Sequence, residues 1–147
     1  MSKLQLARQF VAYWSRTKRH SRLLAPLQLK QCDENGSLVF QWTVQESQLN
    51  QQDNIHLGYL TSVFDVTTNL GMKLGVAEEK LGVSIELKVS NLGAAKTGDV
   101  LTLRTENVKL GRTMAFASAT LQNDRGDMIA TAKHTAYLGG KGMTSDK

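Results

Sequence analysis

This chain of 147 residues has few cysteines, few aromatic residues and no long apolar run. Cys32 is the single cysteine, so no disulfide forms within the chain, and a reducing compartment fits best. Aromatic residues make up only 6%, and no apolar run approaches the roughly 20 residues that a membrane span needs. The length favours one domain, and 41% hydrophobic residues are ordinary for a folded core.

Acidic residues are absent from the first 32 positions. This arm holds seven Lys and Arg residues, whereas the remainder holds eleven basic and thirteen acidic residues. The net charge of +5 is therefore a property of the arm, and the main domain is slightly acidic. With few aromatics among the basic residues, nucleic-acid binding is weakly supported, and we expect no nucleic-acid partner.

The basic arm has three interpretations. Residues 1–23 are expected to form an amphipathic helix whose apolar face includes Phe10 and Trp14. This helix packs on the domain, directs the protein to mitochondria, or binds a lipid or nucleic-acid surface. We expect a mitochondrial location, with the cytoplasm as the alternative, and no stable insertion into a membrane.

Hydrophobic periodicity predicts the order helix, two strands, long helix and four strands. Period-two alternation indicates the strands, and apolar residues at helical spacing indicate a long buried helix, although its β-branched residues also suit a strand. We expect helices at residues 3–22 and 56–76, a loop over 45–55, and strands at 27–30, 37–44, 81–90, 99–109, 113–122 and 127–138.

The C-terminal strands have the short connections of an antiparallel meander, at residues 110–112 and 124–126. In the first of these strands apolar and polar residues alternate, which places Ser84 on the polar face. A sheet that curls around the long helix and buries it on all sides makes residues 24–139 an α+β domain. Residues 140–147 are expected to be a disordered tail.

One carboxylate lies within the apolar stripe of the long predicted helix. Asp65 has apolar neighbours, among them Phe64 and Val66, so its charge is costly to desolvate without a partner or a task. His56 comes nine residues earlier, where the helix begins. Nine residues correspond to about 13 Å of rise and about half a turn, too far for both side chains to serve one reacting atom. If both are functional, two chains combine in one site, which predicts an obligate dimer.

Several short motifs occur in one order along the chain: His-x-Gly…Asp at residues 56–65, Gly-Val-Ser at 82–84, Lys-Leu-Gly-Arg-Thr at 109–113 and Lys-His-Thr at 133–135. In this order and spacing the chain resembles the hotdog-fold acyl-CoA thioesterases, in particular the phenylacetyl-CoA-type branch, from about residue 4 to residue 139. The resemblance implies a curved antiparallel sheet wrapped around one long central helix. It also implies hydrolysis of acyl-CoA to the free acid and CoA.

The resemblance assigns catalytic roles to residues that this chain retains. Asn50 helps hold the thioester or the water, and His56 lies near the thiol leaving group. Asp65, from the opposite protomer, is the catalytic carboxylate, and it is either a general base or a nucleophile. Ser84 orients the attacking water. Gly58 permits close backbone approach at the helix start, where N–H groups suit an oxyanion.

Each of these residues also has a structural interpretation, as a cap, a loop side chain or a surface residue. No metal and no cofactor beyond the CoA of the substrate is expected, because the three histidines and one cysteine have no metal-ligand spacing. His134 lies on the small-residue face of its strand and is expected in the core.

One position departs from the family pattern, which is usually His-Gly-Gly. Leu57 keeps the backbone N–H but adds a side chain, which narrows the acyl channel or moves the donor. This departure favours an alternative function, a weak or inactive hotdog protein that binds acyl-CoA or acts as a scaffold. A hydratase is disfavoured, because it generally needs Asp and His close together near one helix start.

The phosphates of CoA call for basic and donor groups. The resemblance implies a rim beside the strand connections, where the candidates are Leu57, Asn91, Lys96, Lys109, Gly111, Arg112, Thr113 and Tyr137. Ordinary solvated charges beside turns are the alternative for the basic residues. The expected partners are acyl-CoA and a second copy of the chain, as a homodimer or a pair of dimers.

Overall fold

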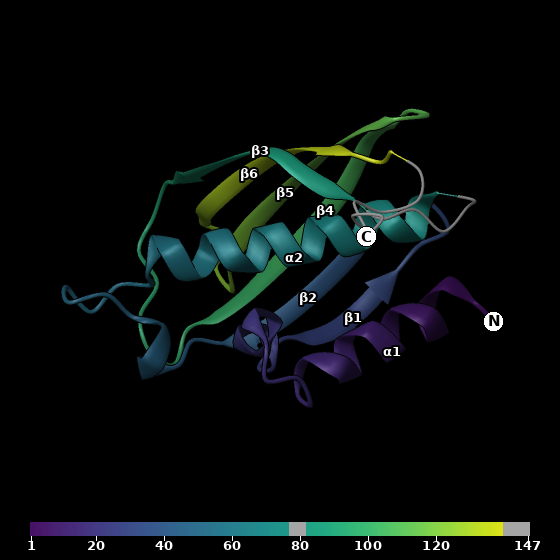
Figure 1. Cartoon of the computed structure of the whole chain (residues 1–147). Coiled ribbons are helices and arrows are strands. Elements are labelled where there is room, and N and C mark those ends of the chain that lie inside the picture. Colours follow the sequence, from purple (N-terminus) through teal and green to yellow (C-terminus); the bar gives the residue numbers. More distant parts are fainter. Residues whose placement is uncertain (77–81, 140–147) are drawn as a thin grey trace.

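The computed structural model describes residues 1–76 and 82–139, so the expected tail lies outside the described residues. Figure 1 shows a curved sheet that lies against the long helix α2, with α1 alongside. The expected order of helices and strands is confirmed, as is the α+β class. In chain order the elements are α1 (Lys3–Trp14), the 3₁₀ helix η1 (His20–Leu24), β1 (Gln28–Cys32), β2 (Leu38–Thr43), the 3₁₀ helix η2 (Glu46–Gln48), α2 (Leu57–Gly75), β3 (Val83–Asn91), β4 (Val100–Leu110), β5 (Met114–Asn123) and β6 (Met128–Tyr137).

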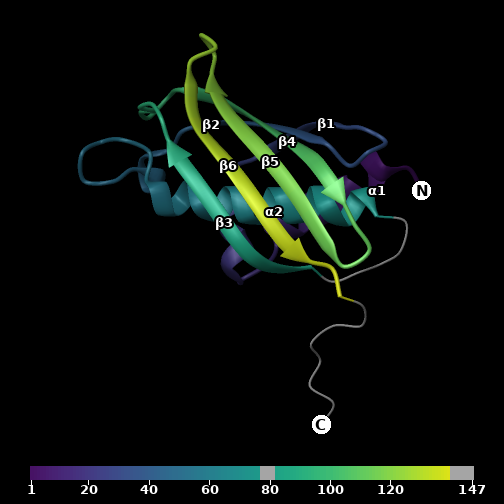
Figure 2. The same cartoon turned by 90° about the horizontal axis from the view of Figure 1, so that it is seen from above.

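The strands form one antiparallel sheet in the order β1-β2-β4-β5-β6-β3. β4, β5 and β6 form the expected meander, which Figure 2 shows from above. β3 does not pair with β4, its neighbour in the sequence, but with β6. The other edge of β3 therefore pairs with no strand in the described part of the chain.

The N-terminal helix is shorter than expected. The sequence predicts one helix over residues 3–22, but α1 ends at Trp14 and η1 begins at His20. Hydroxyl side chains compete for the backbone there, because Ser15 Oγ donates to a carbonyl of the last turn and Thr17 Oγ1 accepts from an N–H two residues later. The expected loop at 45–55 likewise contains a short helix, η2.

One face of α1 packs on the domain. Ala7 and Trp14 are buried in the main core, and the centroids of the Trp14 and Phe40 rings are 5.6 Å apart. Phe10 packs against the same core, while basic residues such as Arg8 remain exposed. The apolar face of the basic arm is thus part of the core.

The long helix α2 contributes core residues along most of its length. One stripe that includes Asp65, Val66 and Asn69 is only half-buried, so the expectation of burial on all sides is wrong for the single chain. None of the helices in the described ranges is long and apolar enough to cross a membrane. The buried side chains of α2 include Leu60, Val63, Phe64, Thr67, Thr68, Leu70, Met72 and Leu74.

Glycines let α2 approach the β1–β2 turn closely. Gly36 in this turn has a φ of +83°, and a Cβ atom there would lie 2.5 Å from the Gly71 carbonyl oxygen and 2.7 Å from the Gly75 nitrogen. Asn107 bridges the same contact, because its Nδ2 donates to the carbonyls of Asn35 and Gly71 at 2.7 and 2.9 Å. Gly71 and Gly75 therefore have a packing role at the end of α2.

Replacing Gly36 by Ala is expected to destabilise the fold by about 3 kcal/mol. About 1 kcal/mol reflects the left-handed backbone, and the rest reflects displacement of the α2 backbone by the new methyl group. Gly126 is the matched control, because its φ is also +83° but a Cβ atom there meets nothing within 4 Å. Gly126→Ala should cost only about 1 kcal/mol. Urea unfolding measures both variants, and equal losses would contradict the packing role.

Candidate active site

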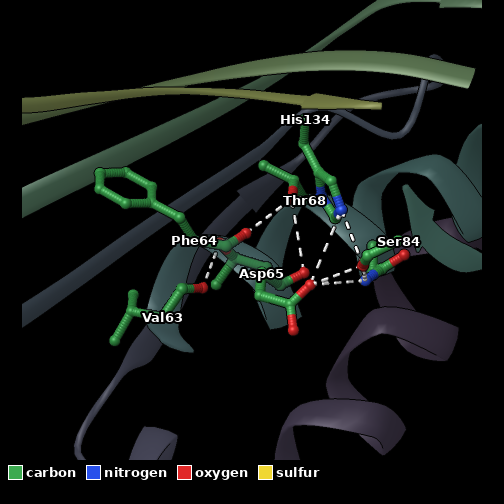
Figure 3. A network of polar contacts seen from close by, with 8 residues as sticks. Val63, Phe64, Asp65, Thr68, Ser84 and His134 are labelled. Atoms are coloured by element: carbon green, nitrogen blue, oxygen red, sulfur yellow. Dashed lines mark hydrogen bonds and ion pairs between the residues drawn. The ribbon is translucent and has the colours of Figure 1, made fainter. Parts of the chain in front are cut away.

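Asp65 lies in a network of polar side chains from α2, β3 and β6 (Figure 3). Ser84 Oγ donates to Asp65 Oδ1 at 2.9 Å, and Asn69 Nδ2 donates to the same oxygen at 3.1 Å. His134 Nε2 lies 2.8 Å from Ser84 Oγ and 3.7 Å from Asp65 Oδ1. These contacts hold the carboxylate by one oxygen. Because the side chain is 42% exposed, the other oxygen can accept a proton from a bound water.

His134 is buried between the sheet and α2. Its Nδ1 lies 2.6 Å from Thr68 Oγ1, which also lies 2.6 Å from the carbonyl oxygen of Phe64. Burial lowers the pKa of His134, and the negative charge of Asp65 opposes this shift only in part. The imidazole is therefore neutral at physiological pH.

The hydrogen bonds define where an added proton can reside. Ser84 donates its one proton to Asp65, so Nε2 of the neutral His134 is the donor to Ser84 and Nδ1 is an acceptor. Thr68 then has one hydroxyl proton for two acceptors, Nδ1 and the Phe64 carbonyl. Protonation of His134 removes this conflict, because Nδ1–H donates to Thr68 and Thr68 donates to Phe64. An added proton therefore resides on Nδ1, which faces Thr68, whereas Nε2, 3.7 Å from Asp65 Oδ1, is already protonated in the neutral imidazole.

A β-bulge turns Ser84 toward α2. Strict alternation predicts Ser84 and Leu87 on opposite faces of β3, but the register of β3 on β6 shifts just after Ser84. Ser84 stands opposite Ala136 and Leu87 opposite His134, and both partners face inward. The extra residue, Ile85, is 61% exposed. The expectation that Ser84 lies on the polar outer face is therefore wrong, and the bulge is the reason.

His56 caps the beginning of α2. Its Nδ1 accepts from the Gly58 N–H at 2.8 Å, and its carbonyl accepts from the Leu60 N–H. The N–H of Gly58 is thus engaged, whereas the N–H of Leu57 begins the helix and has no carbonyl within the helix to bond. A Cβ atom on Gly58 would lie 2.9 Å from His56 Nδ1, so the glycine makes room for the imidazole. The side chain of Leu57 is 43% exposed beside this end.

Asn50 shapes the loop before α2. Its Oδ1 accepts from the N–H groups of Gln52 and Asn54 at 2.9 and 3.1 Å. The Asn54 side chain in turn accepts from the Ala95 N–H at 2.8 Å, which ties this loop to the connection after β3. Both bonds of Asn50 use the amide oxygen, so its NH₂ group is the part that the expected catalytic role would use.

The candidate catalytic residues form two separate groups, one near the middle of α2 and one at its beginning. Asp65 and Ser84 lie together, while His56 begins α2 nine residues before Asp65, or about 13 Å along the helix. Asn50 lies in the loop that precedes His56. One chain therefore does not bring the expected catalytic residues around one reacting atom, as the helix geometry predicts.

The CoA candidates divide in the same way. The turn at residues 109–113 lies beside the end of β6, where Tyr137 stands opposite Val83. Asn91 ends β3 at the other end of that strand, and Lys96 follows in the next connection. One chain therefore does not form the single rim that the sequence analysis expects.

Three members of the network, Thr68, Asn69 and His134, are not among the sequence candidates for the site. Asn69 follows Asp65 by four residues, which places both on one face of the helix. His134 is buried as expected, but it has polar partners. Its signal is weak, because it is the one polar residue on a strand face otherwise formed by alanines at 130, 132 and 136.

Residues 52–130, which include α2 and most of the sheet, match the family model of the thioesterase superfamily. The chain belongs to this family. Acyl-coenzyme A thioesterase 13 of Homo sapiens is 25% identical over 139 residues, which cover 94% of this chain and 98% of that protein. A Caenorhabditis elegans protein that is named as an esterase is 36% identical to this chain over 105 residues. The aligned residues cover 70% of this chain but only 62% of that protein, so this chain spans less than two thirds of its length.

Solved structures of thioesterases share the fold. Zebra fish thioesterase superfamily member 2 has a TM-score of 0.88 at 25% identity, covering 95% of this chain and all (100%) of that one. A hypothetical thioesterase protein of Streptococcus pneumoniae, solved with coenzyme A, has a TM-score of 0.77 at 25% identity, covering 90% and 97%. The hotdog fold and the family that the motifs predict are thus confirmed.

His134 is expected to make the fold less stable as the pH falls below about 6.5. Because its pKa is lower in the folded state, the unfolded chain binds more protons between the two pKa values, and acid favours unfolding. His134→Gln should therefore lose less free energy of unfolding than the wild type between about pH 7.5 and about pH 5. Denaturant unfolding at both pH values measures this, with the exposed His20→Gln as control. The same pH dependence in His134→Gln and wild type would contradict the expectation.

Proposed function

We propose that this thioesterase hydrolyses acyl-CoA to the free acid and CoA, with Asp65 as the group that activates water. The observation that carries the proposal is the half-exposed Asp65 carboxylate, held by Ser84 and Asn69 through one oxygen. The substrate class is supported by the name of the human relative and by the coenzyme A in the Streptococcus pneumoniae structure.

In the proposed reaction Asp65 is either the general base or the nucleophile. As a base it takes a proton from water, and the water oxygen attacks the thioester carbon. As a nucleophile it attacks that carbon itself, and water then opens the anhydride. In both courses the C–S bond breaks and the CoA thiolate takes up a proton. Ser84 and Asn69 engage one oxygen of Asp65, so a proton taken from water resides on the other oxygen, from which it passes to the leaving thiolate.

The beginning of α2 is suited to the thioester carbonyl. The Leu57 N–H and the positive end of the helix dipole stabilise an oxyanion, and such a donor is typically worth roughly 3–4 kcal/mol. Leu57 begins α2 eight residues before Asp65, or about 12 Å of helix rise. A carbonyl bound at Leu57 is therefore out of reach of Asp65 in the same chain. We propose that Asp65 acts on a thioester held by the partner subunit.

The edge strand β3 supports this arrangement. It is nine residues long, it pairs on one side only among the described strands, and Val83 and Ile85 are 40% and 61% exposed. Such an edge is a template for pairing with another strand. Antiparallel pairing of β3 with the β3 of a second copy brings the Ser84 end of one strand to the Asn91 end of the other.

This pairing unites the two groups of candidates. The Asn91 end of β3 leads to Ala95, which is bonded to the loop before His56. Asp65 of one protomer therefore comes to face His56 of the partner subunit. The basic turn at residues 109–113 approaches Lys96 of the partner subunit in the same way. We propose a homodimer, with a pair of dimers as the larger assembly.

Asp65→Asn is expected to lower kcat on the order of 10³-fold, because the amide accepts no proton from water. Release of free CoA from acetyl-, octanoyl- and phenylacetyl-CoA measures the effect. Asp124→Asn, which removes an exposed carboxylate in the β5–β6 turn, is the control and should keep wild-type rates. Full activity of Asp65→Asn would overturn the role of this carboxylate.

The same variant tests the shared site when it is co-expressed with Asn50→Ala. A mixed dimer then contains one site with both defects and one site with neither. With random pairing, activity should return to about a quarter of the wild-type value, well above either variant alone. Activity no higher than the mean of the two variants would place both residues in one chain's site.

Leu57 favours a second candidate function, a protein that binds acyl-CoA with little turnover. Its exposed side chain stands at the helix end that is proposed to hold the carbonyl. CoA esters that bind to wild type and Asp65→Asn alike, with no release of CoA by either, would support this alternative.

We also propose a mitochondrial location, supported by the exposed arginines of the acid-free arm, with the cytoplasm as the alternative. Replacing Arg8, Arg16 and Arg19 by Gln should reduce import of a tagged protein into mitochondria, while hydrolysis remains. Replacing the exposed Arg104, Arg125 and Lys133, which lie outside the arm, by Gln is the control for total charge. Undiminished import of the arginine variant would refute targeting by this arm.

A further inference from the structure

A cavity of about 240 Å³ lies between α1 and α2, and we call it the α1–α2 cavity. Apolar side chains from both helices form most of its wall, and Asn69 and Lys73 are its polar members. The apolar members from the helices are Phe10, Trp14, Val66 and Leu70. The mechanism proposed above uses none of these apolar side chains.

One end of the cavity lies at the catalytic network. Asn69 lines the cavity and also donates to Asp65 Oδ1 at 3.1 Å. Val66 directly follows Asp65 on α2. A thioester carbon within reach of a water at Asp65 therefore has this apolar space beside its acyl group.

The other end lies at Phe10 and Lys73. η1 contacts the beginning of α2, where His20 Nε2 lies 2.9 Å from Ser62 Oγ. α1 contacts the end of α2, where Lys73 Nζ lies 4.7 Å from the centroid of the Phe10 ring. The N-terminal arm thus runs antiparallel to α2 (Figure 1), and a chain that enters beside Val66 meets Phe10 last.

The length of the cavity limits the acyl group. From Val66 to Lys73 the helix rises about 10 Å. An extended hydrocarbon with C–C bonds of about 1.5 Å advances about 1.3 Å per carbon, so about eight carbons span this distance.

We propose that the α1–α2 cavity binds the acyl chain of the substrate and that the enzyme prefers unbranched saturated acyl groups of about eight carbons. This inference rests on the proposed function. Each methylene buried against the apolar wall favours binding, while a polar acyl group would lose its hydrogen bonds to water there. The N-terminal helix is then a substrate-binding element, and Phe10 sets the length of the chain.

Hydrolysis of a series from acetyl-CoA to dodecanoyl-CoA tests the proposal. For the wild type, kcat/KM should rise about fourfold per added methylene up to about the octanoyl ester and then level off. Two variants that change the volume in opposite senses should move this limit in opposite directions. Phe10→Ala opens the far end and extends the rise to longer chains. Val66→Trp fills the end of the cavity beside Asp65, so kcat/KM should stop rising at about the butanoyl ester.

Tyr13→Ala is the matched control, because Tyr13 is an aromatic residue of the same helix that is 46% exposed. It should keep the wild-type length profile. A limit that is the same in wild type, Phe10→Ala and Val66→Trp would overturn the cavity proposal alone, since hydrolysis itself would stand. No hydrolysis of any ester by the wild type would overturn the proposed function as well. If Phe10→Ala does not fold, the shift in Val66→Trp decides the matter.

Discussion

The partial burial of α2 is the constraint on which the rest of the molecule depends. The sheet covers one side of this 19-residue helix and leaves a stripe that includes Asp65, Val66, Asn69 and Lys73. An ionised carboxylate is costly to bury, so Asp65 is tolerated only on this stripe, where solvent and polar neighbours reach it. The polar network and the α1–α2 cavity lie on the same stripe. The proposed acyl-binding cavity therefore adjoins the proposed catalytic carboxylate.

Local patterns are sufficient for the order of the elements but not for the sheet. Helical and alternating periodicity identify α2 and the strands to within about two residues at most ends, because burial repeats along each element. The position of β3 beside β6 depends on pairing between distant segments, and the bulge at Ile85 depends on register. The alternation of apolar and polar residues therefore identifies the strand but places Ser84 on the wrong face. A single inserted residue moves the side chains on one side of it to the opposite face of the sheet.

The residues of the candidate site differ in how far the sequence reveals them. Asp65 is recognisable because a charge in an apolar helix needs a reason. His134 is not, because an inward histidine among alanines has the same pattern whether it is merely packed or hydrogen-bonded. Its partners are Thr68, 66 positions away, and Ser84, 50 positions away, so only the folded chain brings the polar groups together. Burial then lowers the pKa of His134 and keeps the imidazole neutral.

A site shared between two copies requires a defined register for the paired edges. A slip of one residue moves a strand by about 3.3 Å, more than the tolerance of a hydrogen bond. The charges of β3 distinguish three registers of the proposed pairing, centred on Glu86, Leu87 or Lys88. Antiparallel self-pairing centred on Leu87 sets Glu86 opposite Lys88 of the partner subunit, and the two-fold axis repeats the attraction. Centring on Glu86 or on Lys88 would instead place like charges opposite each other, which is destabilising. In the proposed dimer, the charges on this edge strand therefore favour the pairing that brings Asp65 to the helix start of the partner subunit over these two alternatives.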